Sequence, residues 1–230
     1  MAIRRAQLEL DLKPRAGWGG RREGAGRKVG PNPSDPHRRR APLAARHPCH
    51  VTIKVRKDVP SLRTVRLVRE FERSVGEACD RGRFRVVHYS LQSDHAHLIV
   101  EAANTRDLAC GMKAVAARLA RAVNRVFRRN GPVLADRFHL HVLRSPREVR
   151  NAIAYVLLNA RRHLAKRGRR IDPRLRIDPA SSGRWFDGWR GLVPHADDPP
   201  PVARPRTWLL GTGWRRAGLI SLSEVPGIRR

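Results

Sequence analysis

Apolar residues in the middle of the chain recur at two different spacings, which predict strands and helices in turn. Residues 51–55 alternate apolar and polar, as in a half-buried strand. Ser61 can then cap a helix, because the apolar positions of residues 65–78 recur at helical spacing. Segments 84–89 and 95–102 predict two further strands, and the few residues between them predict a hairpin, so the two strands should pair antiparallel.

The same alternation continues through the second half of the core. A second helix is expected over 105–130, a fourth strand over 137–143 and a third helix over 146–165. Ser145 and Glu148 form a capping-box sequence at the start of that last helix. The order β-α-β-β-α-β-α predicts an α+β, ferredoxin-like fold, an antiparallel sheet with helices on one face and the last helix across the other.

Composition divides the chain into three parts. Residues 1–48 are rich in Arg, Gly and Pro and predict a flexible basic arm, residues 49–168 carry the folded core, and residues 169–230 form a Pro- and Trp-rich C-terminal extension. Four of the five tryptophans lie in this extension: Trp185, Trp189, Trp208 and Trp214. These rings either wrap the core or offer stacking surfaces for unpaired bases, and the sequence does not separate the two interpretations.

Charge indicates the kind of partner. The 49 Lys and Arg residues against 20 Asp and Glu give a net charge of +29, which favours a polyanion, nucleic acid first of all. The arm either follows phosphates or only keeps the chain soluble; its candidate DNA contacts are Arg21, Arg22, Arg27 and Lys28. Three scattered cysteines predict neither disulfides nor a zinc knuckle. With no long apolar run and no secretion signal, we expect a cytoplasmic protein without a membrane partner.

Two pairs of histidines have the spacing of metal ligands on a strand. His95 and His97 are separated by one residue, so both imidazoles project to the same side of a strand. His139 and His141 form a rival pair of the same kind. We favour the first pair, because the apolar residues 98–100 that follow it are typical of a central strand. A pair alone is weak evidence for a metal, and a third ligand is needed.

A tyrosine on the last predicted helix is the candidate nucleophile. Tyr155 and Asn159 are four residues apart, which places them side by side on one helix face at the margin of the apolar stripe. Tyr89, the other tyrosine in the chain, falls on a predicted strand and is more simply a core residue. Tyr155 considered by itself is more simply an ordinary half-buried aromatic residue at a contact between helix and sheet, and only its neighbours in the sequence favour a nucleophile.

Taken together, these motifs resemble those of a known family. Residues 93–100 are similar to the HUH strand of the single-tyrosine HUH transposases of insertion sequences, and most closely of the REP-associated tyrosine transposases of bacteria. Residues 155–159 resemble the Y-x-x-x-N helix of that family. Residues 136–139 resemble a further recurrent segment, which adds Arg137 and His139 as candidate DNA contacts. The resemblance covers residues 47 to about 166.

The resemblance implies a site and an activity. His95 and His97 are implied as metal ligands, Asn159 as a third ligand, and Tyr155 as the residue that becomes joined to a 5′ phosphate of single-stranded or hairpin DNA. Imidazole and amide ligands with open positions suit Mg²⁺ or Mn²⁺ better than a closed zinc site. A phenol is a weak nucleophile at neutral pH, and such a cation would assist it. The oligomeric state stays open between a monomer, for which the long tails leave room, and a homodimer, which the family includes.

The sequence departs from the family pattern without losing a catalytic group. Ala96 is a small residue between the two histidines, Ser93 and Asp94 replace a Pro-Asn pair, and Ala160 stands where a proline often follows. Two other functions remain open. The chain could be a catalytically inactive DNA- or RNA-binding protein of the same fold, or an RNA-processing nuclease that forms no covalent intermediate.

Overall fold

The computed structural model describes residues 40–76, 80, 82–166, 168, 177–191, 193 and 196–227. The candidate contacts Arg21, Arg22, Arg27 and Lys28 lie outside the described residues. A four-stranded antiparallel sheet forms the centre, with the spatial order β2-β3-β1-β4. Its strands are β1 (Cys49–Lys54), β2 (Phe84–Leu91), β3 (His95–Ala102) and β4 (His139–Val142).

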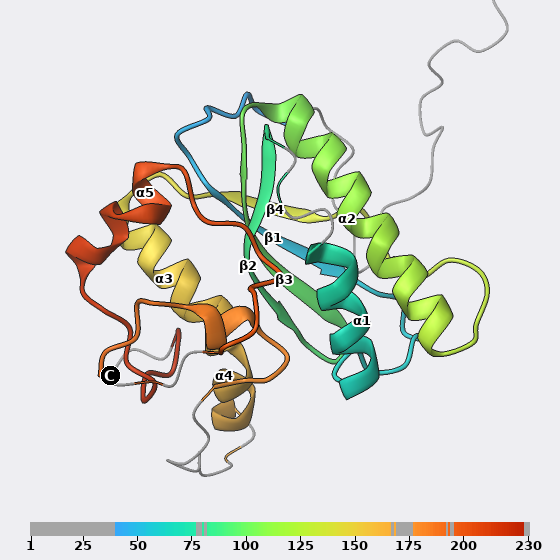
Figure 1. Cartoon of the computed structure of the whole chain (residues 1–230). Helices are drawn as coiled ribbons and strands as arrows, with labels where there is room; N and C mark the ends of the chain where they lie inside the picture. Colours follow the sequence, from blue (N-terminus) through green and yellow to red (C-terminus); the bar gives the residue numbers. More distant parts are fainter. Residues whose placement is uncertain are drawn as a thin grey trace, which may run out of the picture. The chain divides into compact units, whose positions relative to one another are not determined.

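Helices cover both faces of this sheet (Figure 1). Helices α1 (Val65–Gly76) and α2 (Thr105–Val126) pack together on one face, and α3 (Pro146–Leu157) packs against β2 and β3 on the other. The core is split accordingly into one buried apolar cluster on each side of the sheet. The prediction of an α+β, ferredoxin-like fold is confirmed. The last core helix was expected to lie across the second face of the sheet, and α3 lies there. Across the described part of the chain, no helix has the length and apolar character needed to span a membrane.

Several element boundaries differ from the sequence-based expectations; β1, for example, begins at Cys49 and β2 extends to Leu91. Helix α1 is capped by Thr64, whose hydroxyl accepts a hydrogen bond from Leu67 N, and not by the expected Ser61. Leu62, which lies between the two candidates, is buried in the core ahead of the helix. Helix α2 ends at Val126, four residues before the expected end. Strand β4 begins only at His139, so Arg137 lies in the bend that precedes it.

The predicted third helix is two helices. Helix α3 begins with the expected capping box of Ser145 and Glu148, but it ends at a single non-helical residue, Leu158, with φ −107° and ψ 16°. Helix α4 (Asn159–Lys166) begins directly afterwards. The Asn159 side chain does not cap α4, because neither atom of its amide has a hydrogen-bond partner among the described residues. The Tyr155–Asn159 spacing therefore crosses a helix break.

The C-terminal extension packs along strand β2, at one edge of the sheet. Ala203 N donates to Val86 O at 2.8 Å, and Leu91 N donates to Ala180 O at 2.8 Å. The extension contains the 3-10 helix η1 (Ser182–Trp185), the short helix α5 (Trp208–Gly211) and the 3-10 helix η2 (Gly213–Ala217), which packs on α3. Trp189 and Trp214 are buried, whereas Trp208 is 52% exposed. Wrapping of the core is thus confirmed for the buried rings.

One buried carboxylate joins the extension to the sheet. Glu101, near the end of β3, accepts hydrogen bonds from Arg206 N at 2.9 Å, Thr207 N at 2.8 Å and Thr207 Oγ1 at 2.7 Å. The guanidinium of Arg85 lies 3.8 Å from the same carboxylate. The charge is therefore compensated by an arginine and by donors at the start of α5, as a buried carboxylate requires.

Candidate functional site

Histidines gather on the α3 face of the sheet. In the antiparallel pairing of β1 with β3, Thr52 lies opposite His97 and Lys54 lies opposite His95. Because side chains alternate along a strand, His95 and His97 project from the same face, and His50 and Thr52 project beside them from β1. The Nε2 atoms of His95 and His97 are 2.9 Å apart, so the two predicted ligands converge on one point.

Neighbouring side chains orient both imidazoles. The Nδ1 atom of His95 is 2.7 Å from a carboxylate oxygen of Asp94, which has no proton to donate at neutral pH, so the imidazole is the donor in this contact. The Nδ1 atom of His97 is 3.1 Å from both Thr52 Oγ1 and His50 Nε2. Carboxylate, hydroxyl and imidazole partners of this kind hold metal-binding histidines in position in other proteins.

Burial keeps His97 and His50 neutral. Burial, followed by the charges of His95 and His50, lowers the pKa of His97 to about 2. Burial, followed by the charges of His141 and His139, lowers the pKa of His50 to about 4. Both rings therefore carry an unprotonated nitrogen at neutral pH, which is the form that binds cations.

Tyr155 reaches this group of imidazoles from α3. Its half-buried ring packs edge-on against His97, with centroids 5.1 Å apart, and against His50 at 5.6 Å. The guanidinium of Arg162, on α4, lies 5.0 Å from the centre of the same ring. The structure therefore brings together Tyr155 and the favoured histidine pair, which the sequence could only place on separate elements.

Asn159 is fully buried at the start of α4. Neither its amide oxygen nor its amide nitrogen has a hydrogen-bond partner among the described residues. His163 lies four residues further along, on the same helix face, and its ring centroid is 6.2 Å from that of His95. An unpartnered buried amide costs free energy, on the order of 1–3 kcal/mol, unless something absent from the protein alone satisfies it.

The rival pair lies on the same face of the sheet, beyond His50 and Thr52. His139 and His141 are exposed on β4, the short edge strand, where His141 pairs with His50 and His139 with Thr52. Among the described residues, neither ring has a contact with Tyr155. Within the same residues, no three His, Cys, Asp or Glu side chains are close enough to hold a metal ion by themselves.

Four neighbours of the site were missed by sequence reasoning. His50 and Thr52 lie on the first strand, and their position depends on which strand pairs with β3, which local patterns do not determine. Arg162 and His163 depend on the direction that α4 takes after the break at Leu158.

The buried histidines predict acid sensitivity of the fold. Besides His50 and His97, the half-buried His88 on β2 has its pKa lowered to about 4, chiefly by burial. All three depressed values mean that the unfolded chain takes up protons first as the pH falls below about 6.5. Stability is therefore complete above that pH and is lost toward pH 4, by at most about 1.4 kcal/mol per pH unit for each histidine.

This expectation is checked by urea unfolding in EDTA at several pH values between about 7 and 4.5. His88→Gln is expected to lose less stability over that interval than the wild type, because one of the three proton-uptake sites is removed. Equal losses in the two proteins would show that His88 is not held neutral by the fold.

Comparison with known proteins shows similarity to one family and to two solved structures. Residues 46–143 match the family model described as "Transposase IS200 like". A solved structure of a REP-associated tyrosine transposase bound to a REP hairpin is 18% identical, with a TM-score of 0.45 over 56% of this chain and 74% of that one. A proposed transposase from Deinococcus radiodurans R1 is 12% identical, with a TM-score of 0.36 over 48% of this chain and 86% of that one. None of the curated proteins compared with the chain is similar to it.

Proposed function

Because residues 46–143 match the IS200-like transposase family, we propose that the chain cuts and rejoins single-stranded or hairpin DNA through Tyr155. The observation that carries the proposal is the packing of the Tyr155 ring against His97 on the sheet face, 5.1 Å between centroids. A phenol at this position can reach a phosphate that also contacts the imidazole side of the site.

The reaction is a transesterification. The oxygen of Tyr155 attacks the phosphorus and forms a P–O bond, while the bond from phosphorus to the 3′ oxygen breaks and that oxygen leaves as a 3′ hydroxyl after taking up a proton. The DNA then carries its 5′ phosphate on the tyrosine. A later 3′ hydroxyl reverses the same step, so the strand is resealed without an external energy source.

The residues present fit a divalent cation. The convergent Nε2 atoms of His95 and His97 would hold it, and the unpartnered buried amide of Asn159 is the proposed third ligand. Nitrogen and amide oxygen ligands with positions left for phosphate oxygens suit Mg²⁺ or Mn²⁺. When bound, the cation neutralises charge that develops on the phosphate during attack.

Arg162 supports the same reaction from the other side of the tyrosine. Its guanidinium lies 5.0 Å from the ring centre of Tyr155 and carries a permanent positive charge. We assign it to the scissile phosphate, because a phosphate within reach of the Tyr155 oxygen would lie close to it. The high positive charge of the whole chain favours DNA approach in the same way.

Formation of a covalent adduct tests the proposal. Radiolabelled single strands and hairpins are incubated with the full chain and Mn²⁺, and an SDS-stable protein–DNA band is expected that EDTA abolishes. Peptide mass spectrometry is expected to find the nucleotide on Tyr155. Cleavage without an adduct would favour a nuclease that forms no covalent intermediate. Binding without cleavage would favour an inactive binding protein of the same fold, and either result would overturn the proposal.

A further inference from the structure

A cavity lies at the β2 edge of the sheet, away from the candidate site, where the C-terminal extension separates from the strand. The extension pairs with β2 near both of its ends, at Val86 and at Leu91. Between those points the register of β2 with β3 shifts, a β-bulge that turns both Val87 and His88 toward the α3 face. A cavity of about 650 Å³ opens there, a volume within the range of ligand sites.

The walls of this cavity are aromatic and held in place. His88 packs edge-on against Phe186, with ring centroids 5.4 Å apart, and Phe186 packs against the buried Trp214 at 5.4 Å. Gly188 has no room for a Cβ atom, which would lie 2.3 Å from Trp214. The ring nitrogen of Trp185 donates to Asp198 O at 2.9 Å. The guanidinium of Arg184 covers one face of the Trp185 ring, 3.9 Å from its centre, so a ligand can stack only on the other face.

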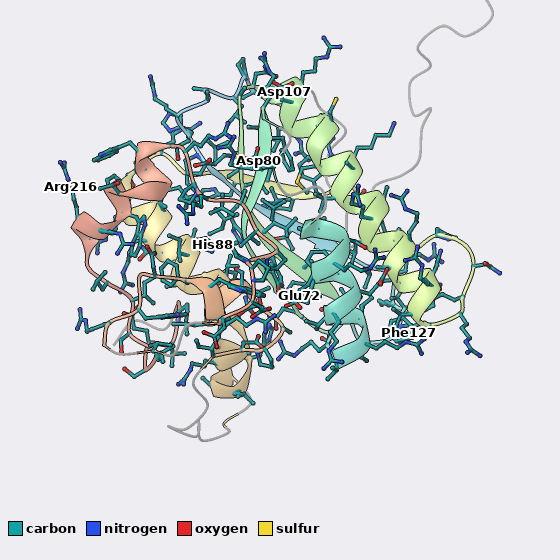
Figure 2. The ribbon with its side chains drawn as sticks, in the orientation of Figure 1. Glu72, Asp80, His88, Asp107, Phe127 and Arg216 are labelled. Carbon is teal, nitrogen blue, oxygen red and sulfur yellow. The ribbon has the colours of Figure 1, made fainter. Side chains whose placement is uncertain are left out.

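Two carboxylates and one guanidinium line the cavity, those of Asp187, Asp198 and Arg204. Each carboxylate is exposed and paired with an arginine, Asp187 with Arg215 at 2.8 Å and Asp198 with Arg184 at 3.2 Å. A carboxylate has more acceptor sites than one arginine fills, so both can still accept from a ligand with N–H donors. His88 lies 3.5 Å through Nδ1 from Ser182 Oγ, and its Nε2 has no partner among the described residues. Figure 2 shows His88 on the side of the C-terminal ribbon, whereas Glu72 lies on the side of α1.

We propose that this cavity binds one unpaired nucleobase of the DNA strand, packed against the aromatic walls with its amino edge toward Asp187 and Asp198. A flat heterocycle matches the ring surfaces, and an exocyclic amino group matches the carboxylates, so adenine, cytosine and guanine fit and thymine does not. The inference rests on the proposed function, because it takes the ligand from the same DNA.

Binding of labelled oligonucleotides tests the inference. Anisotropy is measured for dA12, dC12 and dT12 with the full chain in EDTA, so that no strand is cut. The wild type is expected to bind dA12 and dC12 several-fold more tightly than dT12. Asp187→Asn combined with Asp198→Asn is expected to remove that preference. Losing two negative charges raises the affinity for every oligonucleotide, so the readout is the ratio of the affinity for dA12 or dC12 to that for dT12.

A tryptophan pair supplies the matched control. Trp185→Ala is expected to weaken binding of dA12 and dC12 about tenfold, because one base loses its stacking surface. Trp208→Ala, at an exposed ring that does not line the cavity, is expected to leave both affinities within about twofold. Equal losses in the two variants, or no preference against dT12 in the wild type, would overturn the inference.

Free nucleotides distinguish the source of the base. Titration with dAMP, dCMP and TMP is followed by tryptophan fluorescence, and only weak, millimolar-range quenching is expected. Tight dAMP or dCMP binding that Trp185→Ala abolishes, with oligonucleotide binding unchanged, would assign the cavity to a free nucleotide and overturn the DNA assignment. This test can succeed or fail independently of the test of the proposed function, because binding in EDTA remains measurable even if no adduct with Tyr155 forms.

Discussion

Replacing Tyr155 by phenylalanine is expected to abolish the covalent adduct and to lower strand cleavage by about 10³-fold or more. The substitution removes only the hydroxyl, so the ring contacts with His97 and His50 remain. DNA affinity and thermal stability are therefore expected to stay near those of the wild type. The measurement is single-turnover cleavage of a labelled hairpin at saturating protein and Mn²⁺.

Tyr89 provides the matched control for this loss. Its phenol donates a hydrogen bond to Glu72 at 2.6 Å. Tyr89 packs on the α1 face, so the sheet lies between its ring and the imidazoles of the site. Tyr89→Phe also removes one hydroxyl and is expected to cost some stability, on the order of 1 kcal/mol, without lowering cleavage at a temperature where both proteins are folded. Cleavage that survives in Tyr155→Phe would assign the nucleophile elsewhere.

Replacing His95 by alanine is the second substitution with a large expected effect. One of the two convergent nitrogens disappears, so Mn²⁺ affinity should fall and cleavage at a fixed Mn²⁺ concentration should drop by about 10²-fold or more. The metal affinity is measured directly, by calorimetry or by the electron paramagnetic resonance signal of free Mn²⁺, so the result does not depend on activity alone.

The rival histidine pair gives the control for this experiment. His139→Ala removes an exposed imidazole on β4 from a sequence motif of the same form. It is expected to leave Mn²⁺ affinity unchanged, although a modest loss of DNA affinity is compatible with a DNA contact at the sheet edge. If His139→Ala and not His95→Ala removed the metal, the assignment of the two pairs would have to be exchanged.

The order of elements was predictable because each one carries its own periodicity. The strand 95–102 was predicted with both ends correct, and its alternation of side chains is enough to put His95 and His97 on the same side of the sheet. The capping box at Ser145 marked the start of α3 equally well. Local patterns of this kind need no knowledge of distant parts of the chain.

The surroundings of the site depend on contacts between distant residues, and those were not predictable. His50 contributes because β1 lies beside β3, a fact of sheet order. Arg162 contributes because the helix breaks at Leu158, a residue with ordinary helix propensity, where no proline or glycine signals an interruption. The cavity at β2 requires both a bulge and the C-terminal extension, which is distant from β2 in the sequence.

The carboxylate of Glu101 has a thermodynamic consequence for the C-terminal extension. If the extension detached, water would have to replace the three charge-assisted hydrogen bonds that Arg206 and Thr207 donate to this carboxylate. Such a detached state is costly, so partial opening is suppressed relative to complete denaturation. The last fifty residues and the sheet should consequently melt as one cooperative unit, with a single transition in calorimetry.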